Sequence, residues 1–579
     1  MWINDVRVLH IDLTNRKVRL EHRPDLKDWI GGTGAASKLF EELQGHEIPA
    51  GDDKSPIIFA TGPLNGVLPL MTKVVSIYRS PYTGDWGESH AGGRLGMVMA
   101  YAGIDLLVIT GKSERPVYLV IGPHSVEFKD ARHLWGLDVF TTGRLIRLHE
   151  KRASGRRSIL RIGPAAERGV KFAGVNVDTF RHFGRLGLGT LMGMKNLKAI
   201  VVVGDDSTHF GVNPEYTKFY KEIYDLVVGS DLLHKYHDLG TPQNVLPLNS
   251  IKSLPTKNMQ KTQFEYAENI SGEYFADNLL VRKIACSGCQ VGCIHVGLLR
   301  EQFGPEHEYK YTQVSYDHEL IFALGSMLET KTAEEVLKLI DQVERLGLDA
   351  ISSGVALAWT TEALERGIIS EKDTGIKLQW GDTERYLEAL QMLAYRVNDF
   401  WHLLGEGTMA AAREYGGEDF AAVLGQEMAG YATGPVYYVS QAMGVRHSHL
   451  DTAGYSFDQK ATEYTPEAAL EYIISEDRRR VVLTSLVSCL FARGLYTWDR
   501  VKKGLSIIGY EKQAEEAEEI GDEIRRLRWK LKVAMGYDPD NVKIPKRYFE
   551  TETFRGKPDP EFTNKLIKMY ASHIKELIK

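Results

Sequence analysis

Three of the chain's four cysteines stand close together in the segment Cys286-Ser-Gly-Cys289-Gln-Val-Gly-Cys293, and the fourth, Cys489, lies far downstream. Thiolates at this spacing, in a large chain with few cysteines, favour a metal centre over a disulfide framework. Four thiolates are the ligand set of one [4Fe–4S] cluster. A fourth ligand from a remote segment would join two regions of the chain around that cluster.

Three other interpretations of the cysteines stay open on the residues alone. A tetrahedral zinc ion also takes four thiolates, although zinc sites usually present paired CxxC segments and Cys489 has no neighbouring cysteine. A radical-SAM cluster is disfavoured because its longer spacing precedes the shorter one, the reverse of the order here. The thiols could also bind nothing, with Cys489 as a core residue.

Size and charge narrow the class of protein. A chain of 579 residues is too long for one hydrophobic core and predicts about three or four domains. The net charge of −6 and the pI of 6.3 provide no basic surface for nucleic acid. The N-terminus lacks the pattern of a secretory signal, and no apolar run approaches the ~20 residues of a membrane span. We therefore expect a cytoplasmic protein.

Residues 1–205 are predicted to be rich in strands. Residues 6–13 and 18–22 alternate as in a hairpin, with Asn15-Arg16 at its turn. Further short apolar runs that predict strands are residues 56–60, 74–78, 106–110, 117–121, 158–162 and 199–203.

Two glycine-rich stretches of this region carry cations. The first runs from Lys73 to Arg94 and contains His90-Ala91-Gly92-Gly93; the second runs from Arg181 to Gly193. Glycines interleaved with Arg, Lys and His bring backbone N–H groups and positive charge to phosphate. Neither stretch is the GxGxxG fingerprint of dinucleotide binding. Tight turns with solvated charges are the alternative interpretation.

From about residue 210 the pattern changes to helices. Helical periodicity covers residues 214–228, 333–346, 383–396, 466–486 and 511–533. Pro214 and Pro466 suit a first helical turn, and Thr332 suits an N-cap. The predicted fold class is α+β: a strand-rich N-terminal base domain (1–205) followed by two mainly helical domains (206–415 and 416–579).

Several segments, in this order and spacing, resemble the aldehyde:ferredoxin oxidoreductase family. They are Ala60-Thr-Gly-Pro-Leu-Asn-Gly, Ser80-Pro-Tyr-Thr-Gly, Tyr101-Ala-Gly-Ile-Asp, Gly193-Met-Lys-Asn-Leu-Lys-Ala-Ile, the cysteine segment and Leu346-Gly-Leu-Asp-Ala-Ile-Ser. Family members carry a tungsten, or sometimes molybdenum, bis-pterin beside one [4Fe–4S] cluster. The resemblance implies that the four cysteines hold the cluster, that the strand-rich domain seats the bis-pterin and that the helical domains cover it.

The resemblance also implies which residues hold the two pterins. In the family each helical domain offers one Asp-x-x-Gly-Leu-Asp/Cys segment. The first reads Glu344-Arg-Leu-Gly-Leu348-Asp349 here, and its carboxylates can accept hydrogen bonds from pterin N–H groups. The second ends in Ser488-Cys489 but lacks the leading carboxylate and the Gly-Leu pair, so backbone groups take a larger part there.

The phosphate side departs from the family in two positions. Lys73 stands where the family has an arginine between cluster and pterin, and it keeps the charge without the bidentate fork. His90 stands where the family has an asparagine near the magnesium ion that bridges the pterin phosphates; Ala91, Gly92 and Gly93 follow it. The second pterin-contacting stretch comprises Arg181, His182, Gly184 and Arg185. Surface positions for the two histidines are the alternative.

A Glu and a His near the metal transfer protons in the family. We assign the Glu to Glu319, in an ungapped helical stretch, over Glu308, which copies a shorter local pattern. For the His, His447 aligns best, and His449 is assigned to the cofactor. Because an apolar pocket raises the pKa of a carboxyl group, we expect a raised pKa for Glu319.

The implied reaction is the oxidation of an aldehyde to a carboxylic acid, with electrons leaving through the cluster to ferredoxin or to a small multi-cluster Fe–S subunit. All four cysteines are assigned to the cluster, which favours aldehyde oxidation over aromatic-ring reduction. An oligomer is expected, although Leu337-Lys-Leu-Ile lacks the Glu/His pair of iron-bridged homodimers. The alternatives are carboxylate or thioester reduction in a larger complex, and a non-catalytic Fe–S electron-transfer subunit.

Overall fold

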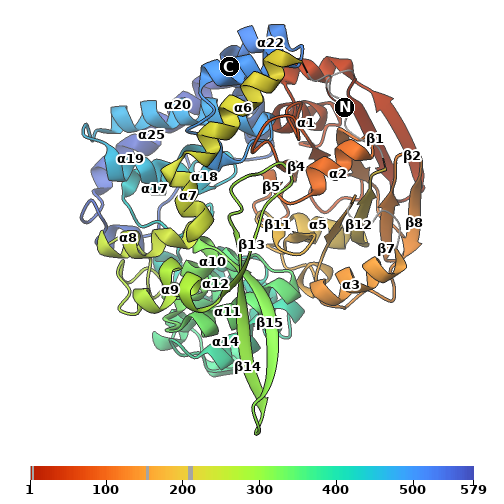
Figure 1. The fold of residues 1–579 in the computed structure, drawn as a ribbon. Helices are drawn as coiled ribbons and strands as arrows, with labels where there is room; N and C mark the ends of the chain where they lie inside the picture. The colour runs from red at the N-terminus through yellow and green to blue at the C-terminus, as the bar shows by residue number, and fades with distance from the viewer. Residues whose placement is uncertain (1, 3–4, 151–155, 206–212) are drawn as a thin grey trace.

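Two six-stranded sheets form the N-terminal domain (Figure 1). The computed structural model describes residues 2, 5–150, 156–205 and 213–579. The sheet orders are β2-β1-β6-β3-β4-β5 and β11-β10-β9-β12-β7-β8. The strands are β1 (Arg7–Asp12), β2 (Lys17–His22), β3 (Ile57–Ala60), β4 (Val74–Arg79), β5 (Trp86–Ala91), β6 (Leu106–Thr110), β7 (Val117–Ile121), β8 (Val126–Asp130), β9 (Arg157–Arg161), β10 (Val175–Val177), β11 (Arg181–Phe183) and β12 (Leu197–Val203).

The predicted N-terminal hairpin is confirmed: β1 and β2 pair antiparallel with Ile11 opposite Val18. Each predicted apolar run forms a strand, because its β-branched residues fit a buried pleated surface. The remaining strands β5, β8, β10 and β11 were not predicted. The helices of this domain are α1 (Gly32–Glu42), α2 (Leu95–Tyr101), α3 (Val139–His149), α4 (Pro164–Glu167) and α5 (Leu188–Met194).

The two sheets meet at their edges. β5 is the last strand of the first sheet and β11 an end strand of the second, and the two strands contact each other. β5 carries His90 and β11 carries His182. The two glycine-rich stretches of the sequence, separate in the chain, therefore lie side by side in the fold (Figure 1).

The rest of the chain is mainly helical, which confirms the predicted fold class. The longer predicted helices appear as α6 (Pro214–Val228), α11 (Ala333–Leu346), α14 (Thr383–Tyr395) and α20 (Pro466–Ser485), while the last predicted helix is interrupted at Glu516 into α22 (Glu511–Glu515) and α23 (Ala517–Ala534). Thr332 caps α11 by accepting from the Glu335 N–H. The division into domains stays a prediction, and its boundary at 206 falls outside the described residues.

Other helices complete this region. They are α7 (Asp231–Asp238), α8 (Val245–Ser250), α9 (Gly272–Asn278), α10 (His318–Leu324), α12 (Ala350–Glu365), α13 (Glu371–Thr374), α15 (Asp399–Leu404), α16 (Thr408–Tyr415), α17 (Pro435–Ala442), α18 (His449–Thr452), α19 (Gly454–Lys460), α21 (Trp498–Ile507), α24 (Arg547–Glu550) and α25 (Pro560–Leu577). No helix within the described ranges is long and apolar enough to cross a membrane.

A three-stranded sheet interrupts the region predicted to be helical. It consists of β13 (Leu280–Ile284), β14 (Ile294–Gly304) and β15 (Glu308–Tyr316), in that order. The β14–β15 hairpin projects away from the body of the molecule (Figure 1). Because β14 begins directly after Cys293, the cysteine segment forms the connection between β13 and β14.

The N-terminal domain packs closely on the end of α20. A Cβ atom on Gly32, whose φ is +35°, would lie 2.5 Å from the Thr484 carbonyl oxygen. Only glycine permits this approach of the α1 start to the α20 end. The contact brings the segment that carries Cys489, directly after α20, against the N-terminal domain.

Candidate active site

A short segment of the N-terminal domain joins the remote cysteine to the other three. The N–H of Leu70 donates to the Gly288 carbonyl at 3.1 Å, and the N–H of Cys489 donates to the Leu70 carbonyl at 2.8 Å. On the same segment, the N–H of Lys73 donates to the Val487 carbonyl at 2.9 Å. The chain thus brings Cys489 to the loop that holds Cys286, Cys289 and Cys293.

The four thiols influence one another electrostatically. Burial, and then the charge of a Cys489 thiolate, raise the pKa of Cys289 to about 11 and that of Cys293 to about 12. Burial alone would also raise the pKa of Cys286, but Lys73 and Arg181 outweigh it and lower that pKa. In the described part of the chain, no three His, Cys, Asp or Glu side chains are arranged around a single metal ion.

Gly92 is the point where the cysteine loop meets the first glycine-rich stretch. A Cβ atom on Gly92 would lie 2.7 Å from Cys286 Sγ, 3.0 Å from Lys73 Nζ and 3.5 Å from Arg181 Cδ. The N–H of Gly93 donates to Cys286 Sγ at 3.2 Å. The side chains of Cys286, Lys73 and Arg181 therefore meet at Gly92, where a larger residue would clash with them.

A cavity of about 550 Å³ extends from this point to the helical domains. It contains most of the residues that the sequence nominates: Lys73, His90, Gly92, Arg181, His182, Gly184, Arg185, Cys293, Glu319, Glu344, Leu348, Asp349 and His449. Eight nominated residues do not line it, and three of these are the cysteines Cys286, Cys289 and Cys489. The other five lie as follows. Ala91 is buried in β5, Gly93 contacts Cys286, Ser488 pairs with Met71 in an isolated bridge, Glu308 is exposed on β15, and His447 lies elsewhere.

Glu319 lies in this cavity and has partners on the facing helical domain. The Tyr431 hydroxyl donates to Glu319 Oε1 at 3.0 Å, and His449 Nε2 lies 3.5 Å from the same oxygen. Burial raises the pKa of Glu319, but the hydrogen bond with His449 and the charge of His318 outweigh it and lower the pKa to about 2. The predicted rise in this pKa is therefore wrong, because the site supplies two imidazoles to the carboxylate.

Asp317 is a carboxyl group of the same cavity that sequence reasoning missed. It caps α10 by accepting from the Leu320 N–H. Burial, and then the charge of Glu319, raise the pKa of Asp317 to about 6. Two neighbouring carboxyl groups with separated pKa values are an arrangement suited to acid–base chemistry. The Asp-His-Glu sequence at a helix start was the available signal.

His447 lines a different cavity, of about 860 Å³, together with Asp85 and Tyr537. Its Nδ1 donates to the Ala442 carbonyl at 2.9 Å, and its Nε2 accepts from Lys532 Nζ at 2.9 Å. Both ring nitrogens are thus engaged away from Glu319. His449, two residues further along, instead faces the Glu319 carboxylate.

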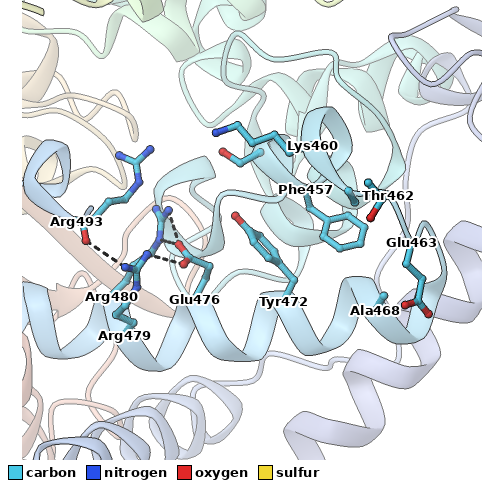
Figure 2. Close-up of a pocket in the computed structure, with 12 residues that line it drawn as sticks. Phe457, Lys460, Thr462, Glu463, Ala468, Tyr472, Glu476, Arg479, Arg480 and Arg493 are labelled. Atoms are coloured by element: carbon cyan, nitrogen blue, oxygen red, sulfur yellow. Dashed lines mark hydrogen bonds and ion pairs between the residues drawn. The ribbon is translucent and has the colours of Figure 1, made fainter. Parts of the chain in front are cut away.

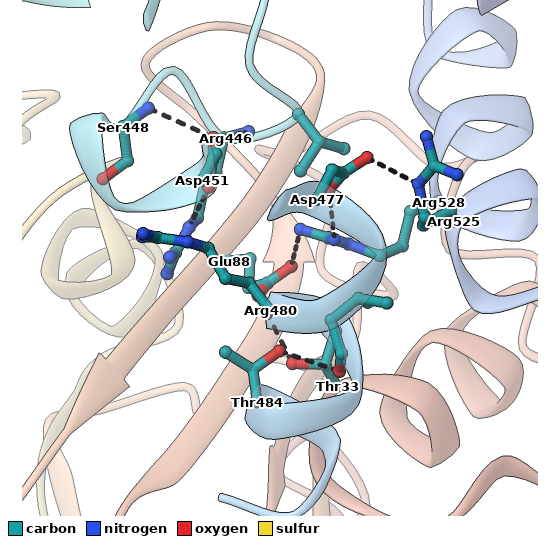
Figure 3. Close-up of polar contacts among 12 residues, drawn as sticks. Thr33, Glu88, Arg446, Ser448, Asp451, Asp477, Arg480, Thr484, Arg525 and Arg528 are labelled. Carbon is teal, nitrogen blue, oxygen red and sulfur yellow. Dashed lines mark hydrogen bonds and ion pairs between the residues drawn. The ribbon is translucent and has the colours of Figure 1, made fainter. Parts of the chain in front are cut away.

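His90 is oriented by Glu88, which belongs to a buried ionic network with Arg528 (Figure 3). His90 Nε2 donates to Glu88 Oε1 at 2.8 Å, and Arg528 of α23 holds Glu88 Oε2 at 2.8 Å. Since Nε2 is occupied, Nδ1 is the ring nitrogen available to a ligand in the cavity. His182 is held in the same way, with Nε2 2.7 Å from Glu344 Oε2. A carboxylate behind an imidazole is the usual support of a metal-binding histidine.

Arg185 and Asp349 form the wall of the cavity near α12. Arg185 Nε lies 3.4 Å from Asp349 Oδ2, and Asp349 caps α12 by accepting from the Ser352 N–H. Leu348 forms an isolated bridge with Ala173, which ties this segment to the N-terminal domain. Arg185 Nη1 is buried and has no hydrogen-bond partner within the described ranges.

These features fit an anionic, hydrogen-bonding cofactor with metal ions. Arg185 Nη1 and His449 Nδ1 are buried nitrogens of the cavity wall that have no hydrogen-bond partner among the residues that the structure describes. The wall also supplies cations at Lys73 and Arg181, and at Gly92 the absence of a side chain leaves the backbone accessible. Phosphate groups require such cations and close backbone, and a cluster requires the adjoining thiolates.

The fold and site together define an oxidoreductase. Family models match nearly the whole chain: the N-terminal domain of aldehyde ferredoxin oxidoreductase over residues 8–204, and domains 2 and 3 of the same family over residues 218–574. The chain belongs to the aldehyde ferredoxin oxidoreductase family.

Its relatives include tungsten-containing aldehyde ferredoxin oxidoreductases of Thermococcus kodakarensis (30% identity, 98% of this chain and 94% of the relative) and Pyrococcus furiosus (29%, 98% and 94%). The WOR-like subunit of aliphatic sulfonate oxidoreductase from P. furiosus is 29% identical over 81% of this chain and 76% of its own. Among solved structures, the active-site complex BamBC of benzoyl coenzyme A reductase with 1,5-dienoyl-CoA shares the fold (TM-score 0.82, 20% identity, 98% and 94% coverage).

Proposed function

We propose that this protein oxidises aldehydes to carboxylic acids at a tungsten bis-pterin, and that the electrons leave through one [4Fe–4S] cluster to ferredoxin or a small Fe–S subunit. One observation carries the proposal: a single cavity runs from Cys293 and Lys73, beside the cysteine loop, to Glu319 and His449. Such a cavity would connect the residues that transfer protons, Glu319 and His449, with the cluster through which the electrons leave.

The chain's own residues divide the work of binding the cofactors. Cys286, Cys289, Cys293 and Cys489 would hold the cluster, with Lys73 between it and the pterin. The remaining cavity residues that would contact the pterins or their magnesium ion are His90, Arg181, His182, Gly184, Arg185, Glu344, Leu348 and Asp349. When bound, the cofactor supplies the metal that accepts two electrons from the substrate.

Glu319 and His449 would move the protons of the reaction. Oxidation of an aldehyde by water releases a carboxylic acid, two electrons and two protons. Because its pKa is about 2, Glu319 is ionised at neutral pH and would accept a hydrogen bond from the attacking water. Asp317, whose pKa of about 6 lies nearer to neutral pH, is the stronger base of the two and would share the proton that this water releases. His449 Nδ1, which has no hydrogen-bond partner in the described part of the chain, would contact the aldehyde oxygen.

Metal analysis combined with a dye assay tests the proposal. Anaerobically purified protein should contain about four Fe and about one W or Mo per chain, and it should reduce a viologen dye with simple aldehydes. Four Fe without W or Mo would instead indicate an electron-transfer subunit. Full metal content without aldehyde turnover would favour carboxylate or thioester reduction.

Two histidine variants separate the nominated residues. His449→Asn should lower kcat by about 10²- to 10⁴-fold, the usual contribution of a proton-transferring group. His447→Asn should instead lower thermal stability, because Lys532 loses one of its buried hydrogen-bond partners. The reverse pattern would return the catalytic role to His447.

A further inference from the structure

A second cavity opens beside the reacting end of the cofactor cavity (Figure 2). It has a volume of about 440 Å³, and we call it the basic vestibule because Lys460, Arg479, Arg480 and Arg493 line it. Ser456, Lys460 and Arg493 line both cavities. The vestibule therefore adjoins the cofactor cavity at a boundary that carries two cations.

Four cations and two carboxylates, Glu463 and Glu476, line the vestibule, so its charge is positive overall. Glu476 accepts from Arg479 Nη2 at 2.7 Å and from Arg480 Nε at 2.8 Å, so one carboxylate serves both arginines (Figure 2). Within the described ranges, no carboxylate pairs with Lys460 or Arg493. Among the described residues, the one hydrogen bond of the Arg493 guanidinium is a donation from Nη1 to the Leu490 carbonyl at 2.9 Å. The cations without acidic partners are thus the two at the boundary.

This boundary leads to the proton-transfer pair. Tyr455 lines the cofactor cavity with Arg493, and its ring stacks on Tyr431 at 4.6 Å between centroids. Tyr431 in turn donates to Glu319 at 3.0 Å. A substrate with its reactive carbon at Glu319 would extend its other end past Tyr455 towards Arg493.

We propose that the basic vestibule binds an anionic group at the far end of the substrate, so that the preferred aldehydes carry a terminal carboxylate, sulfonate or phosphate. The inference rests on the proposed function and specifies its substrate class. A guanidinium fork without a carboxylate partner matches the geometry of each of these anions. A neutral aldehyde would leave Arg493 and Lys460 without a partner.

The test compares aldehydes of equal chain length, one neutral and three ending in carboxylate, sulfonate or phosphate. With a viologen dye, kcat/KM should be at least about tenfold higher for the best anionic aldehyde, and the advantage should shrink as salt rises. Comparison of the three anionic aldehydes identifies which anionic group the vestibule binds best. Equal kcat/KM for neutral and anionic aldehydes would overturn the inference and leave aldehyde oxidation intact.

Two substitutions test whether the vestibule causes the preference for anionic aldehydes. Arg493→Gln and Lys460→Gln should each lower the anionic-to-neutral ratio of kcat/KM by about tenfold. Arg478→Gln is the matched control, because Arg478 lies on α20 beside Arg479 and Arg480 of the vestibule but pairs with Asp522 outside it. An unchanged ratio in the first two variants, or an equal fall in all three, would refute the assignment.

A binding measurement keeps the inference testable without turnover. By calorimetry, 6-hydroxyhexanoate should bind at least about tenfold more tightly than hexan-1-ol, and Arg493→Gln should remove the difference. Equal binding of the two alcohols to the unsubstituted protein would refute anion recognition. If this difference appears while no aldehyde is oxidised, the proposed function fails and anion recognition stands.

Discussion

Gly92→Ala is the substitution whose effect the geometry defines most sharply. The added Cβ would lie 2.7 Å from Cys286 Sγ and 3.0 Å from Lys73 Nζ, both closer than ordinary van der Waals contact. The lysine can move away, but the thiolate has no such freedom once it ligates a cluster. The substitution should therefore displace Cys286 and impair cluster assembly while leaving the sheets intact.

The expected cost of overpacking at this site is about 1–3 kcal/mol. If that cost falls on cluster binding, the affinity for the cluster drops by about 5- to 150-fold, since 1.4 kcal/mol corresponds to a factor of ten. Iron content per chain and the visible absorption of the cluster measure the loss in anaerobically purified protein. Gly51→Ala is the control, because a Cβ there would have nothing within 4 Å.

Full iron content in Gly92→Ala, together with an unchanged unfolding midpoint, would refute the reasoning. It would mean that the cluster does not constrain Cys286 near this glycine. Equal iron loss in Gly51→Ala would point to a general effect of purification. The predicted steric conflict is supported only if iron is lost in Gly92→Ala and retained in Gly51→Ala.

Three further predictions concern the cluster, the ionic network and acid stability. Cys489→Ser should abolish the [4Fe–4S] signal in electron paramagnetic resonance after reduction, and retention of that signal would exclude Cys489 as a ligand. Glu88→Gln should destabilise the protein by about 3–5 kcal/mol in denaturant unfolding, because Arg528 loses the nearer of two buried carboxylates, Glu88 and Asp477. Glu576→Gln, with an exposed carboxylate, is the control. Burial raises the pKa of Glu88, but Arg528 and His90 outweigh burial and lower this pKa. Stability should therefore fall as the pH drops below about 4.5, and Glu88→Gln should weaken that dependence.

Much of the fold was predictable because its signals are local. Short apolar runs bounded by glycine predicted six strands and the hairpin, and helical periodicity located α6 and α11 with their bounds. The strands β5 and β11 were missed because their polar residues, including His90 and His182, break the apolar pattern. The sheet β13–β15 was missed because its outer part is polar and exposed.

The candidate site was predictable in part. Segments matching the family nominated Glu319, Lys73 and Arg181, and all three line one cavity. Sequence spacing could not choose between His447 and His449. The two histidines are two residues apart, yet one meets Lys532 and the other faces Glu319.

The sequence by itself determined the residue types: four cysteines that predict a cluster, glycines among cations that predict phosphate binding, and the periods that predict helices and strands. Only the tertiary structure decided which groups share a space and with what charge. The pKa of Glu319 is lowered by His449, which comes from a distant segment, and the vestibule combines Lys460 with Arg493. Periodicity reports burial along one element, whereas electrostatics depends on distances between elements.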